Sequence, residues 1–326
     1  MNIPHYRDLK HRTDAALMAA RDPKKAILVY TSILTGLSLL TSILLVLLDQ
    51  RISNAGGLSK MDTRSILSTV RSILPVVQTM LLICLEMGYL SAAMRFARKQ
   101  YADHRDLKSG FRYLAPMLRM VLLQALIYAV ILLAVMNVVS WLYLISPLSQ
   151  PLTDAIAQVP DITAALDDQA LATLFLPMLP MLVITMAVFA LIAIPLAYRY
   201  RMANYRLLDH PREGARAALR NSRYMMRGNC FRLFKVDLHF WWYYLLLFLA
   251  TVICYGDSIL PLAGIQLPIS EAAAYFLFYI LYLAIQFVLF YLFRNRLEVT
   301  YTTAYEAIRP QEADSGVVLG NIFDLA

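Results

Sequence analysis

Few residues of this sequence could do chemistry, and Glu86 is the first of them. It is the one charged residue in the long apolar run 73–94. A carboxyl group in such a run costs at least about 2.5–3.5 kcal/mol if the run crosses a bilayer, so it must be paired, protonated or beside a polar cavity. Two interpretations stay open: a proton or cation relay, or a helix–helix contact near the end of the run with Arg95 or Arg98 as partner. Glu86 and Arg95 would be about 13 Å apart on one helix, too far for a direct pair.

A row of arginines is the second candidate, because Arg216, Arg220, Arg223 and Arg227 recur at helical spacing on one face. An apolar stripe runs parallel to this row. A helix with one cationic and one apolar face suits a membrane interface, where each basic residue near anionic headgroups contributes roughly 1 kcal/mol. The alternative is that the stripe packs under a helical bundle and the arginines only orient the chain. The stripe consists of Ala215, Ala218, Leu219, Ser222, Met225 and Met226.

Local signals bound the helix that carries this row, within the patterned segment 211–234. Pro211 suits the first turn of a helix, and Asp209 just upstream is a candidate cap. Gly228 and Asn229 indicate a helix stop. We therefore expect an amphipathic interfacial helix that starts near Pro211 and stops near Gly228.

No other pattern of residues predicts catalysis or metal binding. The sequence holds no HExxH, GxSxG, Walker or Gly-rich dinucleotide motif, and its three cysteines are widely spaced. Asp237 and His239 are two residues apart, which places them on different faces of a helix. We expect no cofactor, no metal ion and no enzymatic activity.

The elements that carry these residues are predicted to cross a membrane. Hydrophobic residues make up 60% of the 326 residues and charged residues only 16%, against about 25% charged in soluble domains. An apolar helix of about 20 residues spans a bilayer. The sequence therefore predicts an all-α, polytopic transmembrane helical bundle. Six runs meet the criterion: 26–48, 73–94, 121–145, 174–198, 236–255 and 272–293.

The basic residues predict the orientation of these spans. Of the 30 Lys and Arg residues, 26 lie in the segments 1–25, 95–119, 199–235 and after residue 293. Cytoplasmic loops are rich in Lys and Arg, so both termini are expected in the cytoplasm. The segment 1–25 is then a cytoplasmic amino-terminal helix and 309–326 a cytoplasmic tail. The net charge of +8 does not predict a nucleic-acid partner, because the basic residues alternate with apolar runs.

Part of the sequence resembles a known family. The run 194–202 (IPLAYRYRM), the segment 208–211 (LDHP) and the run 218–229 (ALRNSRYMMRGN) are similar to the uncharacterised bacterial integral membrane family catalogued as domain of unknown function 975. Weaker similarity covers 88–89, 106–111 and 301–305. Leu196 stands where the family usually has Gly. The resemblance implies a multi-pass protein of a bacterial plasma membrane and supplies no catalytic residues.

Three functional hypotheses follow. The first is a non-enzymatic protein that contacts membrane lipids, anionic ones among them, or a membrane-protein partner through the arginine row. The second is a small-solute transporter or permease that uses Glu86, with the Pro-interrupted apolar segment 256–270 as a re-entrant loop. The third is an intramembrane lipid-processing enzyme. The polar residues that could accompany Glu86 in a transport path are Gln78, Thr79, Gln124, Asn137, Thr185 and Gln286.

Overall fold

The computed structural model is almost entirely helical in the part of the chain that it describes, and no strand occurs in that part. Five of its helices are long and apolar enough to cross a membrane. They are α2 (Pro23–Asn54), α3 (Met61–Ala97), α4 (Leu114–Ile145), α6 (Asp168–Tyr200) and α12 (Glu271–Leu289). The described residues are 2–20, 23–54, 61–102, 104–158, 168–262 and 270–309.

A sixth span exists if a bent pair of helices is counted as one. Helices α9 (Cys230–His239) and α10 (Trp241–Cys254) meet at an angle of 65°. The predicted all-α polytopic bundle of about six spans is therefore confirmed. The fifth predicted run, 236–255, begins inside α9, and the chain turns at Phe240 before it continues as α10. Apart from Thr251, the 14 residues of α10 are all apolar or aromatic, but the helix rises only about 21 Å, which is short for a bilayer core of about 30 Å.

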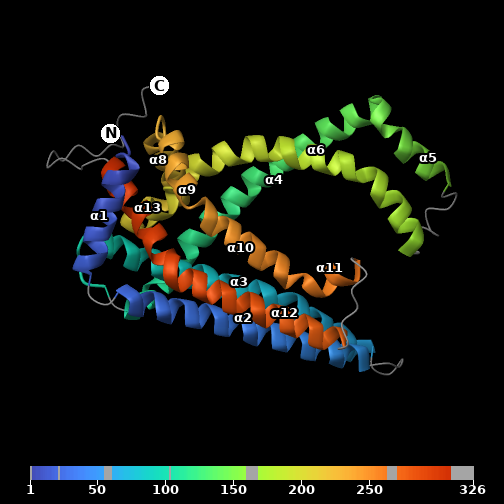
Figure 1. Ribbon diagram of the computed structural model, residues 1–326, viewed down its shortest axis with the longest axis horizontal. Helices are drawn as coiled ribbons and strands as arrows, with labels where there is room; N and C mark the ends of the chain where they lie inside the picture. Colours follow the sequence, from blue (N-terminus) through green and yellow to red (C-terminus); the bar gives the residue numbers. More distant parts are fainter. Residues whose placement is uncertain are drawn as a thin grey trace.

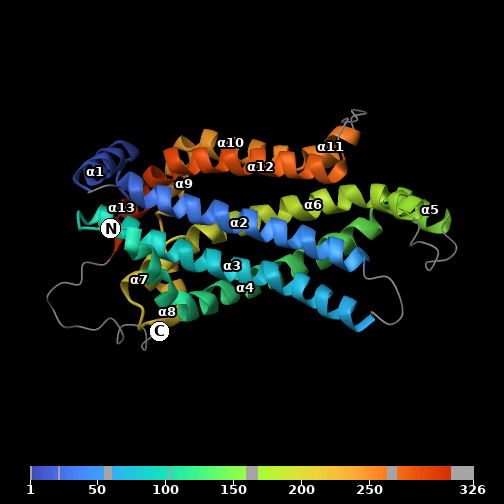
Figure 2. The same cartoon turned by 90° about the horizontal axis from the view of Figure 1, so that it is seen from below.

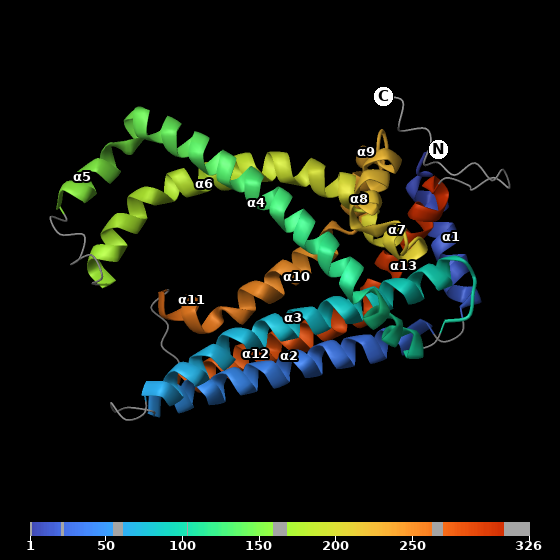
Figure 3. The same ribbon diagram turned by 180° about the vertical axis from the view of Figure 1, so that it is seen from behind.

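The spanning helices form two groups that diverge from one end of the molecule. Helices α2, α3, α10 and α12 run side by side as one layer (Figure 1). Helices α4 and α6 pair with each other as a hairpin, joined through α5 (Gln150–Gln158), and run away from that layer. Figure 3 shows α4 leaving α3 near the start of α4 and ending far from it.

Both ends of the described chain lie where the two groups meet (Figure 2). We call the cluster of short elements at this end the head. The largest fully buried side chains, which include Tyr30, Tyr89, Tyr301 and Tyr305, lie in or beside it, so the core of the protein is here and not along the spans. The head consists of α1 (Tyr6–Ala19), η2 (His104–Tyr113), α7 (Ala203–Asp209), α8 (Gly214–Met225), α9 and α13 (Asn295–Ile308).

Two glycines allow η2 to approach α3 at backbone distance. A Cβ atom on Gly88 would overlap the carbonyl group of Leu107, and one on Gly110 would overlap the carbonyl oxygen of Cys84. Arg95 and Asp106 then join the same two elements by an ion pair of 2.8 Å. The segments 88–89 and 106–111, which resemble the family in the sequence, thus form one contact in space.

The last long helix changes its winding before it enters the head. Five residues, Phe290–Arg294, form a single π-helical turn (η5) between α12 and α13. Such turns insert one extra residue per turn and recur at functional sites. The segment after the sixth predicted span therefore continues as a helix to Ile308, and residues 310–326 of the predicted tail lie outside the described part.

The segment 256–270 begins as the short helix α11 (Gly256–Leu262). Gly256 allows this helix to approach α12, because a Cβ atom there would come within 2.7 Å of the Phe278 ring. The rest of the predicted re-entrant segment, 263–269, lies outside the described residues.

Candidate functional site

Glu86 does not stand alone in its helix. Its carboxylate forms an ion pair with the guanidinium of Arg294, and the Tyr30 hydroxyl donates a second hydrogen bond to it at 2.5 Å. Of the two interpretations of Glu86, a helix–helix contact near the end of the span is the one that the structure has, but the partner is Arg294 and neither Arg95 nor Arg98. Arg95 pairs with Asp106, and Arg98 pairs with Asp209.

A second carboxylate shares the same arginine. Arg294 also lies 3.1 Å from Glu298, one helical turn further along, and the Tyr205 hydroxyl donates to Glu298 at 3.0 Å. The side chains of Arg294 and Glu298 are only 18% and 6% exposed. One cation therefore holds two carboxylates where α3 and η5 meet the head, and we call Glu86, Arg294 and Glu298 the triad.

The triad lies at the end of the spans and not at their middle. Arg294 directly follows the apolar run of α12 and η5. The preceding residue, Phe293, packs edge-on against Trp242 at the start of α10, with ring centroids 4.5 Å apart. Aromatic residues of this kind sit at headgroup depth. Glu86 therefore lies level with the aromatic end of the bundle, where water and opposite charge reduce the cost of a carboxylate.

Three of the six polar residues proposed to accompany Glu86 form hydrogen bonds within their own helices. Thr79, Asn137 and Thr185 each donate to a backbone carbonyl one turn back in their own helix. Such bonds satisfy a polar side chain inside an apolar helix without a second helix. These three residues therefore add no polar lining to the triad.

The structure separates the two faces of α8 in the predicted way. Arg216, Arg220, Arg223 and Arg227 are all exposed. Ala218, Leu219, Ser222, Met225 and Met226 of the apolar stripe are buried, against elements that include α4, α6 and α7, and Ala215 is half-buried. Of the two alternatives for the stripe, packing under the bundle is the one that the structure has.

Two side-chain contacts fix the arginine row relative to α6. The Ser222 hydroxyl donates to the carbonyl oxygen of Arg199 at 2.8 Å, and Arg223 donates to the Tyr200 hydroxyl at 2.9 Å. The helix itself begins at Gly214 and not near Pro211. The predicted stop is present, because Gly228 has a φ of +82° between α8 and α9.

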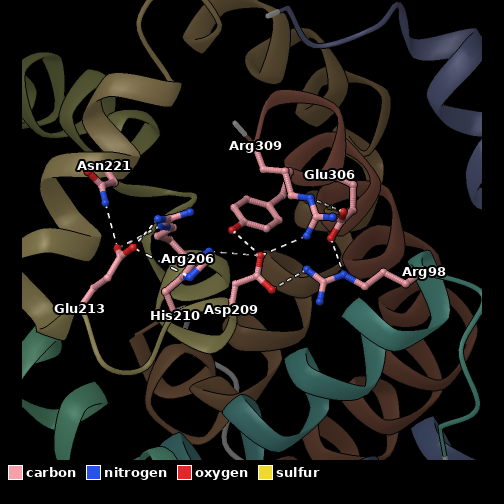
Figure 4. Close-up of polar contacts among 9 residues, drawn as sticks. Arg98, Arg206, Asp209, His210, Glu213, Asn221, Glu306 and Arg309 are labelled. Atoms are coloured by element: carbon pink, nitrogen blue, oxygen red, sulfur yellow. Dashed lines mark hydrogen bonds and ion pairs between the residues drawn. The ribbon is translucent and has the colours of Figure 1, made fainter. Parts of the chain in front are cut away.

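Asp209 was predicted to cap α8, and this prediction was wrong. Asp209 ends α7, and its carboxylate accepts from Arg98 at 2.6 Å, from Tyr305 at 3.1 Å and from Arg309 at 3.3 Å (Figure 4). Burial by itself would lower the pKa of Arg98. Its hydrogen bonds to Asp209 and Glu306 outweigh this effect and raise the pKa above its ordinary value, so Arg98 stays charged. This network ties the ends of α3, α7 and α13 together.

A neighbouring part of the same cluster holds the loop before α8. Arg206 forms an ion pair with Glu213, and Asn221 of α8 donates to Glu213 at 2.9 Å (Figure 4). Glu213 precedes α8 but makes no side-chain cap bond to its backbone. The position of α8, and of its arginine row, therefore depends on ion pairs with α7.

Asp237, which the sequence analysis considered only as a partner of His239, forms a separate polar contact. Its carboxylate accepts from the hydroxyls of Tyr198, at 2.6 Å, and Tyr301. His239 points elsewhere, since its ring stacks on Tyr6 with centroids 3.8 Å apart. The two residues do not form a dyad, as expected from their spacing.

A cavity of about 270 Å³ opens in the head between α1, the end of α3 and α13. Its lining includes the basic residues Arg12 and Lys99, the acid Glu306 and Thr303. Lys99 has a φ of +57°, a left-handed conformation that turns the chain out of α3. No group of three or more His, Cys, Asp or Glu residues that could hold a metal ion occurs in the described part of the chain.

The fold and the charged head define a class: a multi-pass helical membrane protein with long apolar spans and a compact polar end. The chain belongs to the family described as protein of unknown function (DUF975), whose model matches residues 21–311. No curated protein matches the chain, and no solved structure matches it.

The residues that the sequence analysis missed share one property: their partners are far away in the chain. Arg294 and Glu86 are 208 residues apart, and Arg98 and Asp209 are 111 apart. One signal for the triad was present. Arg294 is the first charged residue after the sixth predicted span, 272–293. The span that holds Glu86, 73–94, ends at the same predicted face of the membrane.

Proposed function

We propose that this protein is a non-enzymatic, multi-pass protein of a bacterial plasma membrane that binds anionic phospholipid headgroups through Arg216, Arg220, Arg223 and Arg227. Both termini, and with them the head, lie on the cytoplasmic side in this proposal. The observation that carries it is the division of α8 into an exposed arginine row and a buried apolar stripe.

Rigid support of the row favours binding over a mere positive-inside signal. A loop charge that only orients a chain needs no fixed position, whereas α8 is held by packed apolar residues and by the Ser222 and Arg223 contacts to α6. Arginine presents a planar fork of donors that matches phosphate oxygens. Four such residues near an anionic surface contribute roughly 1 kcal/mol each.

A membrane-protein partner with an acidic surface is the alternative occupant of the same row. The packing of α8 supports both occupants equally, because both would present oxygen anions to the guanidinium groups. The experiment below separates them by identifying what co-purifies.

A small-solute transporter or permease that uses Glu86 is the second candidate function. The observation that favours it is the π-helical turn that delivers Arg294 to Glu86 and Glu298. Against it, the side chains of Thr79, Asn137 and Thr185 form hydrogen bonds within their own helices. The third hypothesis, an intramembrane lipid-processing enzyme, has no supporting arrangement in the described residues.

Purification in native nanodiscs, with bound lipids and proteins both identified by mass spectrometry, tests the proposal. The variant changes Arg216, Arg220, Arg223 and Arg227 to Gln. The control changes Arg7, Lys10, Arg12 and Lys99 to Gln, which removes the same charge from exposed positions of the head. We expect anionic phospholipid to be enriched with the wild type and the control and lost with the arginine variant.

The other outcomes contradict the lipid proposal in distinct ways. A stoichiometric protein lost only with the arginine variant would identify a partner as the occupant. Equal lipid enrichment in all three proteins would mean that the row does not select lipid. Flux of protons in proteoliposomes that is abolished by Glu86→Gln would instead support the transporter.

A further inference from the structure

The helix with an unoccupied apolar face is α9, and not α8. Phe231, Phe234 and Leu238 are 65%, 41% and 55% exposed. Their spacing of three and four residues places them on one side of α9. No other helix of the head that the structure describes carries a row of three exposed large apolar side chains.

The remaining faces of α9 are occupied by the protein. Leu233 and Val236 are buried in the core of the head. On a third side the amino-terminal segment covers the helix: Arg232 donates to the carbonyl oxygen of Ile3 at 3.0 Å, and Tyr6 stacks on His239. The apolar row remains exposed to a partner outside the chain, although the Phe234 ring also meets the Tyr198 ring of α6 edge-on with centroids 6.0 Å apart.

The row continues into the lipid-facing surface of the next helix. Trp241 and Phe248 of α10 are also exposed, 58% and 63%, and α10 is the more apolar half of the bent pair. The axes of α9 and α10 differ by 65°. When α10 lies along the membrane normal, α9 is therefore closer to the membrane plane than to the normal. The chain thus passes from a spanning helix to a surface helix without a break in the exposed apolar residues.

The charges on α9 fit a phospholipid interface. The Lys235 ammonium group lies 4.9 Å from the centroid of the Phe231 ring, at the edge of the row. A lysine in this place covers the apolar surface with its stem and reaches the phosphates with its charge. An aromatic face flanked by a base is the pattern of helices that lie in the headgroup–acyl boundary.

We infer that α9 lies in the membrane–water interface of the leaflet next to the head, with Phe231, Phe234 and Leu238 inserted among the phospholipid acyl chains. The occupant of this face is lipid, because the face is continuous with the spanning surface of α10. The inference does not depend on the arginines of α8, so it stands or falls separately from the proposed function. It adds a second, apolar membrane contact to the head.

Collision rates of spin labels in nanodiscs test the inference. In a background without Cys84, Cys230 and Cys254, single cysteines replace Phe231, Phe234 and Leu238 in turn, and each is labelled with a nitroxide. The nanodiscs contain phosphatidylethanolamine and phosphatidylglycerol. The reference sites are Arg216 in the row of α8 and Phe248 in the span α10.

Oxygen partitions into acyl chains and a nickel complex stays in water, so the ratio of the two collision rates reports the environment of each label. We expect this ratio at positions 231, 234 and 238 to exceed the ratio at position 216 and to fall below that at 248. Because all three side chains are exposed, labelling leaves the core intact, and an unchanged circular-dichroism spectrum verifies this.

Two results would overturn the inference. Ratios equal to that at Arg216 would mean that α9 lies in water. Low collision rates with both reagents would mean that protein, such as a second copy of the chain, covers the row. The two proposals can fail separately. If the α8 arginine variant loses anionic lipid while the labels on α9 report water, the proposed function stands and only this inference is overturned.

Discussion

Arg294 forms an ion pair with Glu86 although 208 residues separate them in the chain, and it lies 3.1 Å from Glu298 at the same time. The pair joins η5 to α3, and Tyr30 of α2 donates to the same carboxylate of Glu86. Removing one partner of a buried ion pair leaves the other charge uncompensated, which is far more costly than never having had the pair. The stability of the head therefore depends on the cation at its centre.

Replacing Arg294 by Met is expected to lower the free energy of unfolding by about 3–5 kcal/mol, because Glu86 and Glu298 would both lose the cation that they share. Glu86→Gln is expected to cost less, about 1–3 kcal/mol, since Arg294 keeps Glu298. Unfolding in mixed micelles measures both. Arg71→Met is the control, because the Asp49–Arg71 pair at the opposite end is about half exposed and should contribute less than about 1 kcal/mol. Equal losses for Arg294→Met and Arg71→Met would contradict the central role of the triad.

The glycines between α3 and η2 should tolerate no side chain. Gly88→Ala and Gly110→Ala would each drive a methyl group into a backbone carbonyl, so we expect a loss of about 1–3 kcal/mol or more from overpacking. Gly36→Ala is the matched control, since no atom lies within 4 Å of the added Cβ. There alanine should be neutral or stabilise the helix by up to about 1 kcal/mol. Thermal unfolding curves that rank the three variants in another order would refute the close contact.

Asp209 should matter more than an exposed acid of the same head. Asp209→Asn weakens the hydrogen bonds from Arg98, Tyr305 and Arg309 together, and we expect a loss of about 1.5–3 kcal/mol. Hydrogen exchange should also become faster at the end of α13. Asp14→Asn, which breaks the more exposed 2.7 Å pair with Arg296, should change stability by less than about 1 kcal/mol. Unchanged exchange in α13 would show that the Asp209 network is dispensable.

The proposed orientation makes a prediction of its own. In a background without native cysteines, Arg51→Cys at the far end of α2 should react in intact cells with a membrane-impermeant maleimide. Lys10→Cys and Arg216→Cys in the head should react only after the cells are made permeable. All three positions are exposed, so their reactivity reports the side of the membrane. The reverse pattern would place the head outside.

Periodicity alone predicted the faces of α8 correctly but not what covers them. The 3.6-residue repeat puts the arginines on one side and the stripe of Ala218 to Met226 on the other, and both sides have the predicted exposure. Whether an apolar stripe faces lipid or protein is not a property of its own sequence. Here α4, α6 and α7 cover it, and the exposed apolar row lies on α9 instead.

The sequence by itself determined the helical class and the long apolar spans, the charge asymmetry along the chain and the stop at Gly228. These features follow from the composition of a window or from the conformational freedom of one residue, so neighbours in the chain suffice to predict them. Only the tertiary structure decided the partner of Glu86, the role of Asp209 and the turn at Phe240. Each of these depends on how helices that are distant in sequence pack side by side. The apolar composition of a span predicts that it crosses a bilayer, but it does not predict which face of the span meets another helix.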